Sequence, residues 1–160
     1  RNWKSSQAKK TLGNFQKDKT IAFFCTSEHE VPVIAEFETS QIGYPSQQAA
    51  VRDIVKACEE LNLHLIIKRH PNSLAANGID RESTDWEWLK SKSYITYLDA
   101  QDETDSYALL KEVSANLVFK SSIGIEATAM KLPSRSLGPA KWAYSTESRI
   151  DNYDLSLIHI

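Results

Sequence analysis

The sequence lacks the features that mark membrane-spanning and nucleic-acid-binding proteins. Its longest apolar runs are about five residues, whereas a spanning helix needs about 20. Its 19 lysines and arginines are balanced by 21 aspartates and glutamates, and no basic stripe of the kind that binds nucleic acid is present. At 160 residues and 41% hydrophobic composition, the chain is long enough for one domain with a sizeable core. We therefore expect a globular domain with no nucleic-acid partner.

Cysteines and standard catalytic motifs are equally scarce. The only two cysteines, Cys25 and Cys58, fall in a predicted strand and a predicted helix. Two buried free thiols of a reducing compartment are favoured over a disulfide or a metal pair. The chain has no G-x-G-x-x-G, no phosphate-loop G-x-x-x-x-G-K, no G-x-S-x-G, no C-x-x-C and no H-E-x-x-H. We expect neither a metal nor a bound cofactor.

The two ends of the chain differ from its middle. Residues 1–19 are lysine-rich without a clean period, and we interpret them as a linker or the end of a preceding domain. Residues 155–160 (LSLIHI) look like a translated transposon end used in sequencing-library adapters, so we interpret them as the scar of a metagenomic fragment. A genuine apolar terminal strand is the alternative. The expected domain is then residues 20–154.

Within that domain, short apolar runs alternate with helical periodicity. The pattern predicts strands at 20–26, 63–68, 94–98, 117–120 and 134–137, and helices at 47–61, 85–92, 104–113 and 123–131. The longest helix should begin after Ser46 as its N-cap, and the helix at 104–113 should turn Tyr107, Leu110 and Val113 inward. Such alternation indicates an α/β fold, a Rossmann-like parallel sheet flanked by helices.

Basic residues and a histidine close the second predicted strand. Lys68, Arg69 and His70 are followed by Pro71, which should hold His70 in an extended conformation at the edge of the sheet. There the imidazole could donate to a phosphate oxygen, with Arg69 adding positive charge. A basic cluster on the surface is the alternative interpretation.

Another polar segment, residues 121–127 (SSIGIEA), follows the fourth predicted strand and opens a helix. Free backbone N–H groups there would suit a phosphate, and Glu126 could accept hydrogen bonds from a sugar hydroxyl. The alternative is that Ser121 or Ser122 only caps the helix and Glu126 faces water. With Ser122 as the cap, the reciprocal position of a capping box would be Ile125, which argues against a full box.

A third polar segment, residues 26–30 (TSEHE), ends the first strand and includes Ser27. The carboxyl ends of parallel strands meet at one edge of a sheet, where ligands of such folds bind. We therefore expect Ser27, His70 and the Ser121–Ser122 pair to face one crevice that binds a nucleotide or a nucleotide-sugar.

With these motifs in place, the chain resembles the C-terminal, donor-binding half of bacterial GT-B glycosyltransferases of the capsule polysaccharide type. That group includes Kdo transferases, sialyl- and polysialyltransferases and teichoic acid glycerophosphotransferases. The likeness covers about residues 20–145. It depends on the end of the first strand, residues 23–27 (FFCTS) with Glu30, on His70-Pro71 and on residues 121–127, in this order, with Leu132-Pro133 and Leu137-Gly138 after them.

The resemblance implies a role for each motif. His70 would stabilise the charge left on the departing nucleotide phosphate, Ser121 and Ser122 would hold phosphate, and Glu126 would bind ribose hydroxyls. Arg69 and Ser27 would complete the site. The donor would be a CMP-, CDP- or UDP-linked sugar, and the acceptor a glycan or lipid-linked glycan. The general base would lie in an N-terminal half absent from this fragment, which alone should be inactive.

The implied location is the cytoplasm, with peripheral association of the full protein at the inner face of the cytoplasmic membrane.

Two other functions stay open. A nucleotide-sugar 2-epimerase is similar around the helix start, but it usually has a glycine pair where this chain has Ser121-Ser122. A non-catalytic receiver-like interaction domain would need acidic residues near the first strand, and Asp99 is its only candidate phosphoacceptor.

Overall fold

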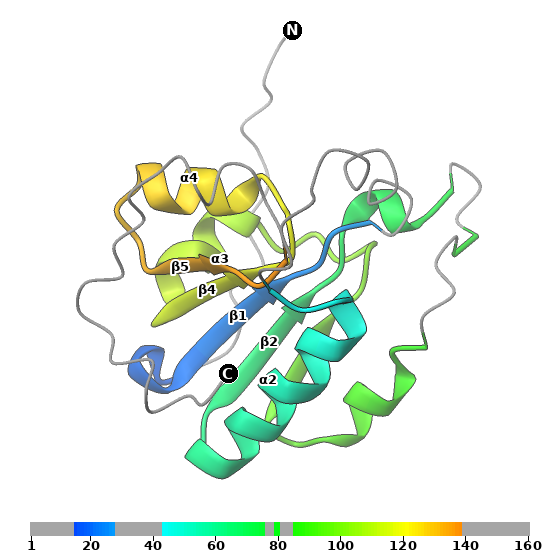
Figure 1. Ribbon diagram of the computed structural model, residues 1–160, viewed down its shortest axis with the longest axis horizontal. Helices are drawn as coiled ribbons and strands as arrows, with labels where there is room; N and C mark the ends of the chain where they lie inside the picture. The colour runs from blue at the N-terminus through cyan, green and yellow to red at the C-terminus, as the bar shows by residue number, and fades with distance from the viewer. Residues whose placement is uncertain (1–14, 28–42, 76–78, 81–84, 139–160) are drawn as a thin grey trace, which may run out of the picture.

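A computed structural model describes residues 15–27, 43–75, 79–80 and 85–138. This part of the chain is an α/β domain with a Rossmann-like fold (Figure 1), as the sequence predicts. Its strands are β1 (Thr20–Phe24), β2 (His64–Lys68), β3 (Ile95–Leu98), β4 (Ala115–Val118) and β5 (Ser134–Ser136). Its helices are α2 (Gln47–Leu61), α3 (Ser106–Glu112) and α4 (Ile123–Ala129), with 3₁₀ helices η1 (Lys17–Lys19), η2 (Pro71–Ser73) and η3 (Glu87–Ser91). Glu28, Glu30, residues 1–14 and the expected scar at 155–160 lie outside the described residues.

The five strands form one parallel sheet in the order β3-β2-β1-β4-β5. The chain builds one side of the sheet outwards from β1 to β3, then crosses back to place β4 on the other side of β1. The strand order therefore reverses between β1 and β4. In folds of this kind, ligands bind outside the carboxyl ends of the strands at that reversal.

Helices cover both faces of the sheet, which explains why the strands are apolar on both sides. On one face α2 and η3 bury a core that includes Phe23, Ile54 and Leu65. On the other face α3 and α4 enclose a second core around Ile66, Leu110 and Val118. In Figure 1, α2 (cyan) and α4 (yellow) lie on opposite sides of the sheet.

The sequence predicts the longest helix, α2, from end to end. Ser46 has an extended backbone, and its hydroxyl accepts a hydrogen bond from the Ala49 N–H at 3.1 Å. At the other end Asn62 adopts the left-handed conformation, and its N–H donates to the last helical carbonyls. Both ends of α2 are thus defined by local hydrogen bonds and backbone conformation.

Two predicted helices differ from the structure in detail. The stretch predicted as a helix at 85–92 forms the shorter 3₁₀ helix η3, with Trp86 before it and Leu89 within it buried in the core. In α3 the expectation that Tyr107 points inward is wrong, since Tyr107 is 47% exposed. Leu109 is buried in its place, and residues two apart lie about 200° from each other around a helix.

Part of the segment interpreted as a linker packs on the domain. Phe15 stacks on the ring of His64, with centroids 4.5 Å apart, and contacts the core under α3 and α4. Within the described residues, no helix combines the length and the apolar character needed to cross a membrane.

Candidate functional site

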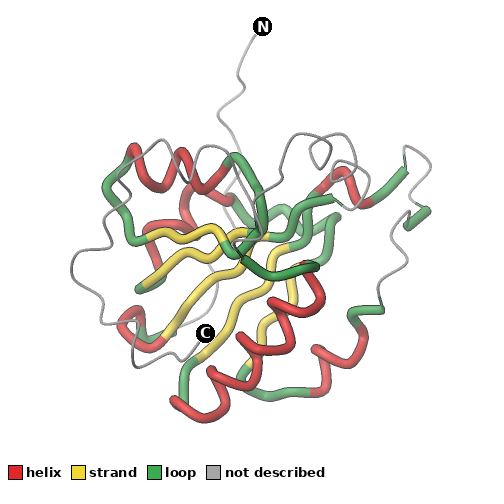
Figure 2. The backbone as a smooth tube through the Cα atoms, in the orientation of Figure 1, coloured by secondary structure: helices red, strands yellow, loops and turns green. Residues whose placement is uncertain are grey.

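The strand order brings the three predicted polar segments to one edge of the sheet. β1 lies between β2 and β4, and all three run in the same direction. Ser27 therefore follows the central strand, with His70 beyond β2 on one side and Ser121 beyond β4 on the other. Figure 2 shows these strands (yellow) running side by side before they continue into loops (green). We call this the carboxyl edge.

Hydrogen bonds made by Thr26 connect the chain segments at the carboxyl edge where the strand order reverses. The Thr26 hydroxyl donates to the carbonyl of Phe119 and so joins the chain beyond β1 to the chain beyond β4. The buried side chain of Gln47, at the start of α2, accepts from the Thr26 N–H at 2.7 Å. It also donates to the Thr26 carbonyl at 3.2 Å. Two strand ends and a helix start are thereby held together through Thr26.

His70 has its ring orientation set by the backbone that follows it. It has an extended backbone, as predicted from Pro71, and is the N-cap of η2. Its Nδ1 accepts a hydrogen bond from the Asn72 N–H at 3.1 Å. Since Nδ1 is the acceptor, the neutral ring carries its proton on Nε2. The partly buried imidazole thus presents an N–H donor at the carboxyl edge.

The two basic residues before His70 are not on the surface, so the alternative of a surface basic cluster is wrong. Lys68 and Arg69 are 5% and 4% exposed. The Lys68 ammonium donates to the carbonyl of Asp102 at 3.3 Å, and desolvation lowers its pKa despite the nearby carboxylates of Asp102 and Asp105. Both side chains therefore serve contacts inside the fold.

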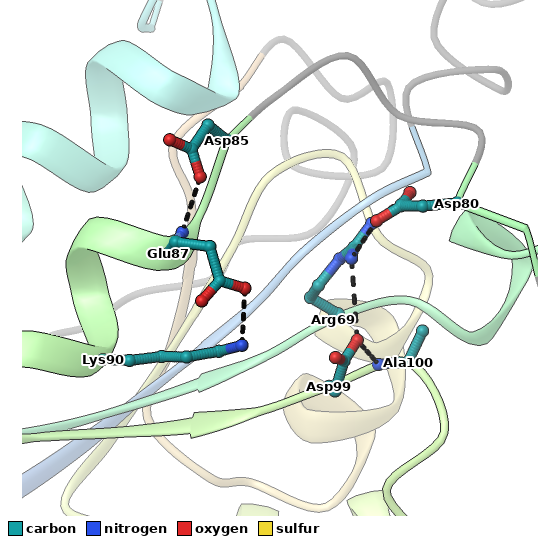
Figure 3. A network of polar contacts seen from close by, with 7 residues as sticks. All are labelled: Arg69, Asp80, Asp85, Glu87, Lys90, Asp99 and Ala100. Atoms are coloured by element: carbon teal, nitrogen blue, oxygen red, sulfur yellow. Dashed lines mark hydrogen bonds and ion pairs between the residues drawn. The ribbon is translucent and has the colours of Figure 1, made fainter.

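Arg69 was expected to bind the donor phosphate, and the structure shows its guanidinium already held by carboxylates. Its two terminal nitrogens donate to the two Asp80 oxygens at 2.7 and 2.9 Å. One of them also lies 3.6 Å from an oxygen of Asp99. Figure 3 shows Arg69 between these two acids. A phosphate would have to compete with a bidentate ion pair for this group.

The start of α4 does not match the simple capping interpretation. Ser122 is the N-cap, but its backbone is already helical, and its side chain makes no cap hydrogen bond. A cap residue needs an extended backbone for its hydroxyl to reach the next turn. The backbone N–H groups of Ser121 and Ser122 have no acceptor among the described residues. Just before them, Lys120 adopts a left-handed conformation with φ 62°, which turns the chain from β4 into α4.

Glu126 does not simply face water. It is partly buried, and its carboxylate lies close enough to the Tyr107 hydroxyl on α3 to be the main reason why the pKa of that phenol is raised. A carboxylate placed in this way could also accept a hydrogen bond from a sugar hydroxyl.

Ser27 lies deeper than expected. It is 1% exposed, and its buried hydroxyl has no hydrogen-bond partner among the residues that the structure describes. Buried hydroxyls nearly always have partners in folded proteins. This one leaves an unmet hydrogen bond at the end of the central strand.

Sequence reasoning missed two residues that shape the edge. Gln47 gave no signal, because a polar residue in a first helical turn is ordinary, and Asp80 pairs with a residue eleven positions away across a loop. The prediction that Cys25 and Cys58 are buried and form no disulfide is confirmed. Among the described residues, no group of three or more histidine, cysteine or acidic side chains is arranged to hold a metal.

Comparison with known proteins does not assign the chain to a family. No family model matches it. No curated protein and no solved structure gave a significant match. The fold class therefore rests on the strand order described above, and the function is argued from the geometry of the carboxyl edge.

Proposed function

We propose that this domain binds the donor nucleotide-sugar of a glycosyltransferase, with the nucleotide phosphate at the carboxyl edge between β2 and β4. The observation that carries the proposal is the hydrogen bond from the Asn72 N–H to Nδ1 of His70. It commits Nε2 of the neutral ring to donating, after the end of β2, which is the neighbour of β1 on the side away from the reversal. A fixed donor at such a place suits an anionic ligand.

Glycosyl transfer breaks the bond between the anomeric carbon of the sugar and a phosphate oxygen, and negative charge collects on the departing phosphate. The Nε2–H of His70 would donate to that oxygen. The N–H groups of Ser121 and Ser122 would bind the phosphate from the other side. Groups already oriented towards the developing charge stabilise the transition state without reorganising.

Glu126 supports the same placement of the ligand. It lies in the first turn of α4, beyond Ser122, and its partly buried carboxylate is near the Tyr107 hydroxyl. With phosphate at the start of α4, a ribose could reach this carboxylate. The acceptor and the general base are assigned in this proposal to another part of the protein, in line with the resemblance to capsule-type GT-B enzymes.

A titration of the chain with CMP, UDP and CDP tests the proposal, followed by amide NMR shifts and by the melting temperature. At least one nucleotide should bind and shift the residues of the carboxyl edge. If none binds, the donor-domain proposal is wrong.

His70→Ala should weaken CMP binding much more than cytidine binding, because cytidine lacks the phosphate. His64→Gln is the matched control, since His64 begins the strand that His70 follows and lies at the opposite edge of the sheet. Equal losses of CMP and cytidine in His70→Ala would show that His70 does not contact phosphate.

A further inference from the structure

Arg69 is held in a way that fits a role different from the one expected from the sequence. The side chain of Arg69 is 4% exposed, whereas that of its partner Asp80 is 44% exposed. The pair is bidentate, with each terminal nitrogen donating to a different carboxylate oxygen, a geometry that adds specificity as well as energy. Asp99 approaches the same guanidinium from the end of β3 (Figure 3).

The ion pair closes the loop that begins with His70. From His70 the chain forms η2, in which the Ser73 N–H donates to the His70 carbonyl at 3.0 Å. Leu74 then forms a bridge with Asp80, and the Ala75 N–H donates to the Ile79 carbonyl at 2.8 Å. Asp80 then pairs with the guanidinium of Arg69, which directly precedes His70 in the chain.

The backbone of Arg69 is fixed as well, since its N–H donates to the Leu98 carbonyl at 2.9 Å. Arg69 therefore has its main chain tied to β3 and its side chain tied to the far end of the loop. His70 and Asn72, whose mutual hydrogen bond orients the imidazole, lie between these two attachments.

We propose that Arg69 is a positioning residue, whose ion pair with Asp80 holds η2 and His70 in place. Nδ1 of His70 then keeps its hydrogen bond from the Asn72 N–H, and its Nε2–H stays directed at the donor phosphate. The phosphate part of this inference rests on the proposed function. The orientation of the ring does not, and it can be measured without any ligand.

The test uses the full chain and the variant Asp80→Asn, which keeps the shape of the partly exposed side chain and removes its charge. The ring ¹⁵N shifts of His70, assigned with His70→Gln, report which nitrogen carries the proton. The wild-type protein should show a protonated Nε2 and a bare Nδ1, and Asp80→Asn should show a mixture of the two forms. CMP should bind Asp80→Asn about tenfold more weakly, the value of one hydrogen bond to a charged group, with cytidine binding unchanged.

Asp85→Asn is the matched control, because the Asp85 carboxylate accepts from the Glu87 N–H at 2.8 Å beside η3 rather than from Arg69. It should leave the His70 ring nitrogens and the affinity for CMP as they are. Arg69→Lys adds a second test, because a lysine keeps the charge but cannot make the bidentate pair. It should resemble Asp80→Asn in both readouts, with a retained cooperative melt showing that it is folded.

Two results would overturn the inference. One is an unchanged protonation pattern of His70 in Asp80→Asn. The other is tighter CMP binding in Asp80→Asn, which would mean that Asp80 competes with the ligand and that Arg69 binds phosphate itself. If wild-type protein binds no nucleotide, the proposed function fails, while the ring nitrogens still decide whether Arg69 positions the imidazole.

Discussion

The side-chain amide of Gln47 pairs with the backbone of Thr26 in both directions, accepting from its N–H and donating to its carbonyl. Gln47 and Thr26 are both buried, so water cannot replace these bonds. Gln47→Leu should therefore lower the free energy of unfolding by about 2 kcal/mol or more, since it leaves buried backbone groups unpaired. Urea denaturation measures this, with Gln101→Leu at an exposed turn as the control. A loss no larger than that of the control would mean that the backbone of Thr26 finds other partners.

The two serines at helix starts should respond differently to alanine. Ser46 caps α2 through its hydroxyl, whereas Ser122 makes no cap hydrogen bond at α4. Ser46→Ala should cost about 1 kcal/mol of stability, the usual value of an N-cap. Ser122→Ala should cost clearly less in the same denaturation experiment. Equal losses would contradict the difference in capping that the structure shows.

Gly43 lies at a close approach of two backbone segments. Its φ is +111°, and a Cβ there would lie 2.6 Å from the carbonyl oxygen of Leu137. The neighbouring Tyr44 N–H donates to that same carbonyl at 2.8 Å. Gly43→Ala should cost about 2 kcal/mol or more, because it adds backbone strain and a clash. Thermal melting would show it, and the exposed neighbour Pro45 provides the control as Pro45→Ala.

His64 should make stability depend on pH. Burial lowers its pKa below 6.5 in the folded protein, where its Nε2 lies 2.8 Å from the Thr96 hydroxyl. As the pH falls, the unfolded chain takes up the proton first, so stability should be full above about pH 7 and decline towards pH 5. His64→Gln should flatten this part of a plot of unfolding free energy against pH. A slope that persists unchanged in His64→Gln would have to come from other groups.

Cys58 should be inert while the protein is folded. Burial raises the pKa of its thiol to about 12, and the side chain lies in the core beneath α2. Alkylation needs a thiolate that the reagent can reach, so modification at pH 8 should wait for unfolding. Iodoacetamide labelling followed by mass spectrometry, with and without urea, measures this. Rapid labelling of Cys58 in native protein would place it nearer the surface than the structure does.

Local signals predicted the parts of the fold that local chemistry determines. Ser46 and the apolar period after it predicted α2, and short apolar runs between turns predicted every described strand to within a few residues. The expectation for Tyr107 is wrong because it follows a spacing of three residues only. Leu109, Leu110 and Val113 fit the alternating spacing of one apolar helix face, and these are the residues that are buried.

The candidate site could be predicted only in outline. The parallel order of strands brings His70 and Ser121 to one edge, and that follows from the alternation of elements. The burial of Lys68 and Arg69 could not be foreseen, because basic residues are rarely buried without partners, and the partner Asp80 is contributed by a distant part of a loop. Long-range pairing of side chains leaves no mark in the local sequence.

The central place of β1 has a consequence for folding. On one side β1 pairs with β2, the next strand in the sequence, and on the other side it pairs with β4. The second pairing spans a long stretch of chain, since the Ser114 hydroxyl donates to the Thr20 carbonyl 94 positions away. Closing so long a loop is slow compared with forming neighbouring helices. Until β4 arrives, a strand that is apolar after Thr20 has one open side that could pair with another chain. The most buried strand of the finished domain is thus the one most exposed to aggregation while the chain is being made.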